Sequence, residues 1–159
     1  MAVEHRRLAG ADLEKVTLEL EKVDWHDHAF ETMWARPLGG DRFQLQNVPF
    51  YAYGIGYDDV VEASHAGDRN LVRTVVERGG HSTYRIFVTN DAALKRFQEF
   101  WYPLERCGCS VERATERLFG VDVPPDADIY RVYDLLQAGQ SASVWDFEEA
   151  HVGHRLKSQ

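Results

Sequence analysis

The first half of the chain alternates apolar and polar side chains at every second position, which is typical of half-buried β-strands. In Lys15–Val23, for example, valine and leucine at the even positions are separated by threonine and glutamate. The same pattern predicts strands over residues 15–23, 30–38, 42–48, 59–63 and 70–78. Pro49 should end the third of these, because proline has no N–H to donate to a neighbouring strand. Five short strands with little helix between them are typical of a small antiparallel β-barrel of the SH3-like type, which we expect over residues 14–79.

After the turn signal at Gly79-Gly80, strand patterns alternate with helical ones. Strands are predicted over residues 83–89, 110–113, 117–123 and 143–150, with one long strand over residues 110–123 as the alternative. A helix is predicted between the first two strands and another before the last. The order strand, helix, strand, strand, helix, strand predicts a ferredoxin-like βαββαβ unit over residues 80–152.

Capping residues set the expected ends of the two helices. Asn90 is placed to cap the first helix, which Gly108 ends. Asp126 is placed to cap the second helix, which Gly139 ends. Four apolar residues of the second helix recur at helical spacing and should form its buried stripe: Ile129, Val132, Tyr133 and Leu136.

The predicted fold class is therefore α+β, with a barrel followed by a helix-backed sheet. A four-stranded sheet with both helices on one face leaves its other face open, and that face has to be covered. The barrel is the nearest cover, because the Gly-Gly junction is too short to let the two modules move independently. We expect the modules 14–79 and 80–152 to pack as one rigid body.

Composition limits the classes of partner. The chain of 159 residues has 18 Lys+Arg and 26 Asp+Glu, a formal charge of −8, which disfavours a nucleic-acid partner held through phosphates. The most basic run, His5-Arg6-Arg7, is expected to be solvated. No window is apolar enough for a membrane span and the N-terminus lacks the apolar core of a signal peptide, so no membrane partner and a cytoplasmic location are expected. The sequence does not define an oligomeric state.

The strongest local feature is the stretch Asn47–Gly56, which no regular element claims. It carries Phe50, Tyr51 and Tyr53 together with two glycines. Glycines let another molecule approach the backbone and aromatic rings supply contact area, as in a binding loop. The alternative is that Phe50 closes the barrel end while the tyrosines pack against the second module.

A second candidate lies just after the Gly-Gly junction, where His81 and Ser82 are adjacent. Neighbours on an extended chain point to opposite faces, so His81 is badly placed to act as a base for Ser82. His81 and Arg85 share one strand face and are predicted to bind an anion or a carboxylate. The alternative is a capped turn between the modules.

Metal binding has weaker support. His26 and His28 would share a face if their segment is extended, but no third ligand accompanies them. His151 and His154 form an i, i+3 pair, and the Cys107-Gly108-Cys109 spacing is shorter than the usual zinc spacing. We expect the histidines to be polar surface residues, and neither a metal nor another cofactor is predicted.

Parts of the chain resemble a family of small bacterial proteins known only as a domain of unknown function. The resemblance lies in Asn47–Gly54, Asp59-Val60-Val61 and Gly80–Arg85 and spans about Val16–Val152. The stretch from Cys109-Ser110 to Val121–Pro124 also resembles the family and favours the hairpin over one long strand. Many family members have Gly-Asp where this sequence has Asp58-Asp59, which implies a different turn here. The resemblance implies a fold and carries no activity.

No sequence motif indicates catalysis, since a nucleophile elbow, a phosphate-binding loop and a dinucleotide fingerprint are all missing. The first hypothesis is a non-enzymatic protein-binding module. Its sharper form is an inhibitor or immunity-type protein whose acidic surface steers it onto a basic bacterial toxin. The alternative is a small-molecule sensor or enzyme with a ligand site in the cleft between the modules. The residues predicted to bind in either case are Asn47, Phe50, Tyr51, Tyr53, Asp59, His81, Ser82 and Arg85.

Overall fold

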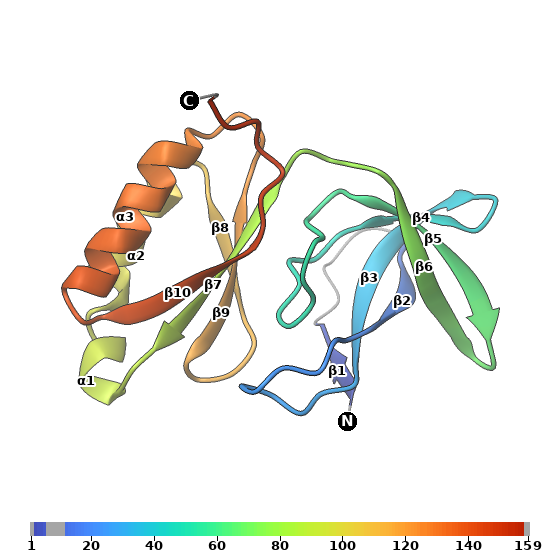
Figure 1. The fold of residues 1–159 in the computed structure, drawn as a ribbon, viewed down its shortest axis with the longest axis horizontal. Helices are drawn as coiled ribbons and strands as arrows, with labels where there is room; N and C mark the ends of the chain where they lie inside the picture. Colours follow the sequence, from blue (N-terminus) through green and yellow to red (C-terminus); the bar gives the residue numbers. More distant parts are fainter. Residues whose placement is uncertain (1, 6–11, 158–159) are drawn as a thin grey trace.

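The computed structural model describes residues 2–5 and 12–157, and this part of the chain forms ten strands and three short helices. The strands are β1 (Ala2–Glu4), β2 (Glu14–Glu19), β3 (Phe30–Gly39), β4 (Arg42–Leu45), β5 (Val60–Ala66), β6 (Arg69–Glu77), β7 (Ser82–Val88), β8 (Ser110–Arg113), β9 (Leu118–Val123) and β10 (Trp145–His151). The helices are α1 (Asp91–Leu94), α2 (Phe97–Arg106) and α3 (Ile129–Ser141). Two sheets lie side by side, and the helices lie on the outer side of the second (Figure 1). The predicted α+β class is confirmed.

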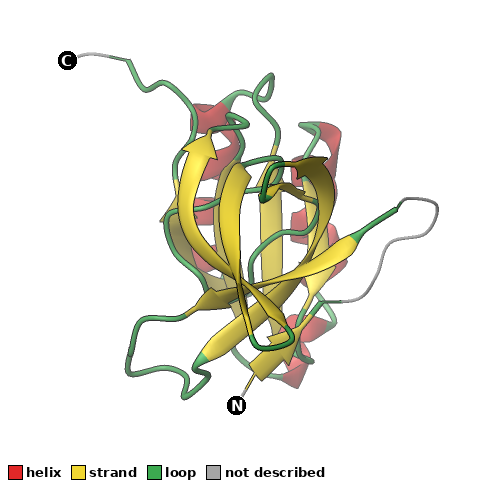
Figure 2. Ribbon diagram, turned by 90° about the vertical axis from the view of Figure 1, so that its right-hand side faces the viewer, coloured by secondary structure: helices red, strands yellow, loops and turns green. Residues whose placement is uncertain are grey.

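The first sheet curls on itself. Its strands follow the order β1-β3-β2-β6-β5-β4, and β3 also pairs with β4, so five of the described strands follow one another in a ring (Figure 2). Its core contains Val16, Met33, Leu45 and Val61, all buried. β2 ends at Glu19, four residues before the predicted end, and residues 20–29 run as a loop toward the second sheet.

Strand β1 was not expected from the sequence. It pairs in parallel with β3, and the residue after it, His5, is buried. The prediction that His5 is solvated is therefore wrong, because its imidazole bonds to a buried carboxylate of β3. The other two residues of that basic run, Arg6 and Arg7, lie outside the described residues.

The second sheet has the order β10-β7-β9-β8, and each neighbouring pair is antiparallel. The hairpin between β8 and β9 is confirmed over one long strand. Alternate residues of β7 point to opposite faces. Tyr84, Ile86 and Val88 pack under the helices. Arg85 and the residues two positions away on the strand, Thr83 and Phe87, point to the other face, toward the first sheet.

The first predicted helix is two helices. Asn90 caps α1 as predicted, with its side chain accepting a hydrogen bond from Ala93 N at 2.8 Å. Arg96 N then donates to Ala93 O, a tight turn that ends α1 before α2 begins at Phe97. Gly108 follows α2 with φ of 99°, so its predicted role as the stop is confirmed.

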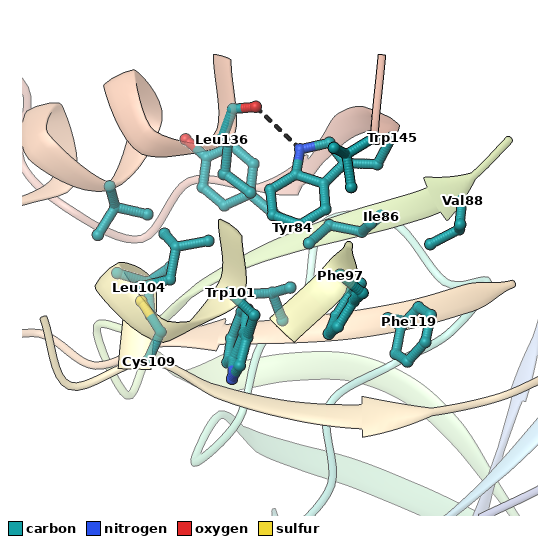
Figure 3. Packing of buried hydrophobic residues seen from close by; sticks show 14 of the residues in the cluster. Tyr84, Ile86, Val88, Phe97, Trp101, Leu104, Cys109, Phe119, Leu136 and Trp145 are labelled. Carbon is teal, nitrogen blue, oxygen red and sulfur yellow. Dashed lines mark hydrogen bonds between the residues drawn. The ribbon is translucent and has the colours of Figure 1, made fainter. Parts of the chain in front are cut away.

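Helix α3 differs from its prediction at both ends. Its cap is Asp128, which accepts hydrogen bonds from the N–H groups of the first turn, and not Asp126. Gly139, predicted to end the helix, lies inside it. The residue here is glycine because the indole of Trp145 occupies the space that a side chain would take. Trp145 Nε1 donates to the Leu136 carbonyl at 2.9 Å (Figure 3). Tyr133, predicted to be buried, is 41% exposed.

The helices α1, α2 and α3 are all too short or too polar to cross a membrane, as judged over the residues that the structure describes.

Candidate ligand site between the two sheets

The stretch 47–56, here called the aromatic loop, crosses from the first sheet to the second and is held from below by Glu31 of β3. The Glu31 carboxylate accepts hydrogen bonds from three consecutive backbone N–H groups, those of Phe50 at 2.5 Å, Tyr51 at 3.0 Å and Ala52 at 2.9 Å. The side chain of Glu31 is fully buried. A single carboxylate therefore fixes the backbone of the loop at its aromatic residues.

The charge on Glu31 is balanced by His5, whose Nε2 lies 2.5 Å from the carboxylate. Burial raises the pKa of Glu31, but the hydrogen bond and charge of His5 and the loop N–H groups outweigh it and hold the pKa below its ordinary value. Burial lowers the pKa of His5, but the hydrogen bonds and charges of Glu112 and Glu31 outweigh it and raise the pKa. The two residues thus favour each other's charged forms.

The second sheet holds the same loop through two charged residues. Glu112 of β8 accepts hydrogen bonds from Val48 N at 2.6 Å and Asn47 Nδ2 at 3.2 Å. Arg85 of β7, fully buried, donates to the carbonyls of Pro49 at 3.2 Å and Ala52 at 2.8 Å. The contact area between the sheets, here called the seam, is thus built around the loop backbone.

A small residue of β9 lets the loop come close. A Cβ at Gly120 would lie 3.0 Å from Val48 Cγ1 and 3.2 Å from a ring carbon of Phe50. Glycine at this position therefore leaves room for the aromatic loop to pack directly on the sheet.

At one edge of the seam, Arg85 forms a network with Glu148 and two aromatic residues. Its Nε donates to Glu148 at 2.9 Å, and its guanidinium lies 4.6 Å from the ring centroid of Tyr53. The Tyr53 hydroxyl donates to Glu148 and accepts from Trp25 Nε1 at 3.0 Å. Trp25 and Tyr53 are each 37% exposed, so this edge reaches the surface.

At the other edge, Asp59 closes the link between the aromatic loop and the end of β6. It is buried and accepts hydrogen bonds from Gly56 N at 2.9 Å and Gly79 N at 2.8 Å. Its neighbour Asp58 has φ of 68°, the left-handed region that favours glycine. A turn different from that of relatives with Gly-Asp was expected here, but Asp58 adopts a backbone conformation that glycine at this position could adopt without strain.

His81 lies between two carboxylates at this edge. Its Nδ1 bonds to Asp122 at 2.8 Å, and its Nε2 lies 3.4 Å from Asp58. Burial lowers the pKa of His81, but the hydrogen bond and charge of Asp122 and the charge of Asp58 outweigh it and raise the pKa. His81 and Arg85 share a face as predicted, yet each already bonds to carboxylates of the protein.

Ser82 points away from His81, as expected, and bonds to the C-terminal segment. Its hydroxyl accepts from Gly153 N at 2.9 Å and lies 2.6 Å from His154 Nδ1, while His154 Nε2 bonds to the Pro124 carbonyl. These bonds fix the chain at Gly153 and His154 against β7 and the residues that follow β9. Residues 158–159 lie outside the described residues.

The structure brings all eight predicted binding residues together at the seam, but seven of them are buried there: Asn47, Phe50, Tyr51, Asp59, His81, Ser82 and Arg85. Tyr53 is the exposed one. Binding by these residues stays a prediction, and a ligand would meet them through the surface near Tyr53 and Trp25.

A hollow of about 390 Å³ lies at that surface, between the 20–29 loop and the second sheet. We call it the junction hollow; its lining includes Trp25, His26, His28, Tyr51, Phe87 and Arg117. The ring of Tyr51 stacks on Trp25 with centroids 5.3 Å apart, and Phe87 meets Trp25 edge-on. The hollow is thus an aromatic-walled site with contributions from both sheets.

His26 lines this hollow and has one unpaired ring nitrogen. Its Nδ1 accepts a hydrogen bond from His28 N at 3.1 Å, so in the neutral ring the proton is on Nε2. That Nε2 is buried and has no hydrogen-bond partner within residues 2–5 and 12–157. Burial lowers the pKa of His26, and the charges of His28 and Arg85 lower it further, which favours the neutral ring. This N–H is therefore a buried donor that the described residues leave unsatisfied.

The two histidines do not come with a third metal ligand. Their rings stack with centroids 5.6 Å apart, and no group of three or more His, Cys, Asp or Glu side chains in the described part of the chain is arranged to hold a metal ion. Cys107 and Cys109 are free thiols beside the end of α2. That no metal is bound, with His26 and His28 as weak candidate ligands, stays a prediction.

Sequence reasoning missed several residues of the seam and the junction hollow, among them Glu31, Glu112 and Trp25. Glu31 gave one signal, since it is a lone carboxylate near the start of a strand whose other buried residues include Met33 and Ala35. Glu112 and Trp25 gave none, because their partners lie far away in the sequence.

Comparison with known proteins identifies the family. The model of DUF4265, a domain of unknown function, matches residues 31–147, and the chain belongs to this family. A solved structure titled "Novel crystal structure of a hypothetical protein from Neisseria gonorrhoeae" is 18% identical, with a TM-score of 0.69 over 94% of this chain and 99% of that chain. At this identity the likeness shows the fold alone. No curated protein matches the chain. The resemblance to a family of unknown function is confirmed.

Proposed function

We propose that this chain is a non-enzymatic small-molecule-binding module whose site is the junction hollow. The ligand would be a planar molecule that stacks on the aromatic wall and offers a hydrogen-bond acceptor. The observation that carries the proposal is an aromatic hollow of about 390 Å³ whose lining includes His26, a residue with a buried Nε2–H that finds no acceptor among the described residues.

The fold supports this placement. We propose that the first sheet is an SH3-like barrel and the second, with strand order β10-β7-β9-β8, a ferredoxin-like unit. The aromatic loop fills the middle of the seam, so a ligand is left with its edge, where Tyr51 and Trp25 meet. Sites between modules are common places for small ligands.

Titration of the labelled protein with benzamide, followed by residue-resolved NMR, tests the proposal. Benzamide has a ring and an acceptor, and toluene serves as the probe without the acceptor. We expect saturable shifts at Trp25, His26 and Phe87 with benzamide. His26→Phe keeps a ring but removes the donor, and it should weaken binding about three- to tenfold. His65→Phe, an exposed histidine of β5, is the matched control and should bind as the wild type does.

Equal binding of benzamide and toluene, or equal binding by wild type and His26→Phe, would contradict a hydrogen bond between the ligand acceptor and His26. A panel of flat acceptors, including benzoate and nicotinamide, that leaves Trp25 and Phe87 unshifted would reject the hollow as a ligand site.

A second candidate is the protein-binding, immunity-type function. It is favoured by the exposed Trp25 and Tyr53 at the surface, where Trp25 donates to Tyr53 and Tyr53 donates to Glu148. Aromatic residues dominate many interfaces, and the net charge of −8 suits a basic partner. In a low-salt pull-down, wild type should capture a basic protein that the Trp25→Ala/Tyr53→Ala variant does not. Capture that is equal for both, or absent, counts against this function.

A further inference from the structure

A second hollow lies on the helix-covered face of the second sheet, the face turned away from the seam. It has a volume of about 330 Å³, and its lining includes Tyr84, Tyr130, Tyr133, Asp134, Glu149 and Leu156. We propose that this hollow, here called the tyrosine pocket, binds a small organic cation through an alkylammonium group. The proposal shares no residue with the junction hollow and does not depend on it.

Helix geometry places three of the lining residues together. Tyr130, Tyr133 and Asp134 are at positions i, i+3 and i+4 of α3, so they share one face. The two tyrosines are 43% and 41% exposed, so their rings are open to a ligand. Exposed aromatic rings beside a carboxylate are a common setting for cation binding, in which the cation lies over the faces of the rings.

The sheet supplies the remaining aromatic ring and a second carboxylate. Tyr84 of β7 is buried, and its hydroxyl donates to Glu149 of β10 at 2.9 Å. Burial raises the pKa of Tyr84, and the bond to Glu149 raises it further, so the hydroxyl stays protonated and remains the donor in this bond. Glu149 keeps further oxygen lone pairs for an ammonium group.

Charge and size select the class of ligand. The lining residues carry two carboxylates and no Lys, Arg or His side chain in the part of the chain that is described, so an anion would be repelled. The ammonium of Lys157 lies 5.5 Å from the ring centroid of Tyr130, which shows that this ring already attracts a cation of the chain itself. The volume is at the small end for ligand sites, so it suits a small molecule or a single side chain.

Titration of the full chain with choline, monitored by NMR, tests the tyrosine pocket. The probe 3,3-dimethylbutan-1-ol has the same shape as choline without the charge. We expect choline to shift the amides of Tyr130, Tyr133 and Glu149 saturably and the neutral probe to leave them unchanged. Nα-Acetyl-lysine amide, which keeps its ε-ammonium, separates the two sources of an alkylammonium in the same titration. Tighter binding than choline indicates a protein side chain, and weaker binding a free small molecule.

Two variants test the chemistry. Tyr133→Ala and Glu149→Gln should each weaken choline binding about three- to tenfold. Tyr102→Ala removes a comparably exposed tyrosine of α2 outside the pocket and should bind as the wild type does. Circular dichroism checks that each variant is folded. Equal binding of choline and its neutral analogue, unchanged binding by Tyr133→Ala, or no shift with either ammonium probe would overturn the proposal.

Discussion

Gly139 of α3 lies directly under the indole of Trp145, so that a Cβ at position 139 would overlap the indole ring. Trp145 is buried and is further fixed by the hydrogen bond from Nε1 to the Leu136 carbonyl (Figure 3). The glycine therefore serves close packing between helix and sheet. Its helical conformation needs no glycine, since its φ is not positive.

This contact predicts the effect of Gly139→Ala. Alanine favours helices over glycine by about 1 kcal/mol, yet the added methyl has to displace the buried indole. We expect a net loss of about 1–3 kcal/mol in the free energy of unfolding, measured by urea denaturation. Gln137→Ala, at an exposed position of the same helix, is the control and should change little. An increase in stability for Gly139→Ala would show that the indole moves aside freely.

The buried pair of Glu31 and His5 predicts a larger loss in the free energy of unfolding. Glu31→Gln keeps the size of the side chain but removes the charge that meets His5 and the three loop N–H groups. Breaking a buried pair in this way costs about 3–5 kcal/mol, so the variant should have a much lower urea midpoint. Glu62→Gln, at an exposed position of β5, is the matched control. A loss below 1 kcal/mol would mean that the loop backbone is held mainly by other contacts.

His81 predicts a dependence of stability on pH. Its pKa is raised in the folded protein, so its charged form contributes stability fully below the ordinary pKa of about 6.5, and that contribution is lost as the pH rises through the folded pKa. The difference in unfolding free energy between wild type and His81→Gln should therefore be largest near pH 6 and shrink toward pH 9. A difference that stays constant with pH would show that only the neutral hydrogen bond to Asp122 matters.

Local patterns predicted most of the regular structure. Alternation located nine of the ten described strands, and Asn90 marked the start of the first helix correctly. The misses have physical causes. Gly139 was taken as a helix stop because the sequence does not show its contact with Trp145, which is the reason for the glycine. Strand β1 was missed because three residues are too few to show alternation. Asp126 and Asp128 are both possible caps, and the sequence does not distinguish them.

The candidate site was predictable only in part. The aromatic loop stands out in the sequence because Phe50, Tyr51 and Tyr53 occur together between strands. Its partners do not stand out, since Glu112 is 64 residues from Val48 and the choice among many acidic residues depends on the packing of the sheets. Of the junction hollow, the sequence indicated only Tyr51 and a place between the modules. The rest needs the 20–29 loop, part of which was expected to be strand.

The way the aromatic loop is held has an evolutionary consequence. The loop belongs to the first half of the chain, but its backbone N–H and carbonyl groups bond to Glu112 and Arg85 of the second sheet. Recombination between distant relatives at Gly79-Gly80 would join a loop to a sheet that lacks the matching acid and base, and would leave buried N–H and carbonyl groups unpaired. Selection should therefore transmit the two halves as one unit, with their facing positions changing in step.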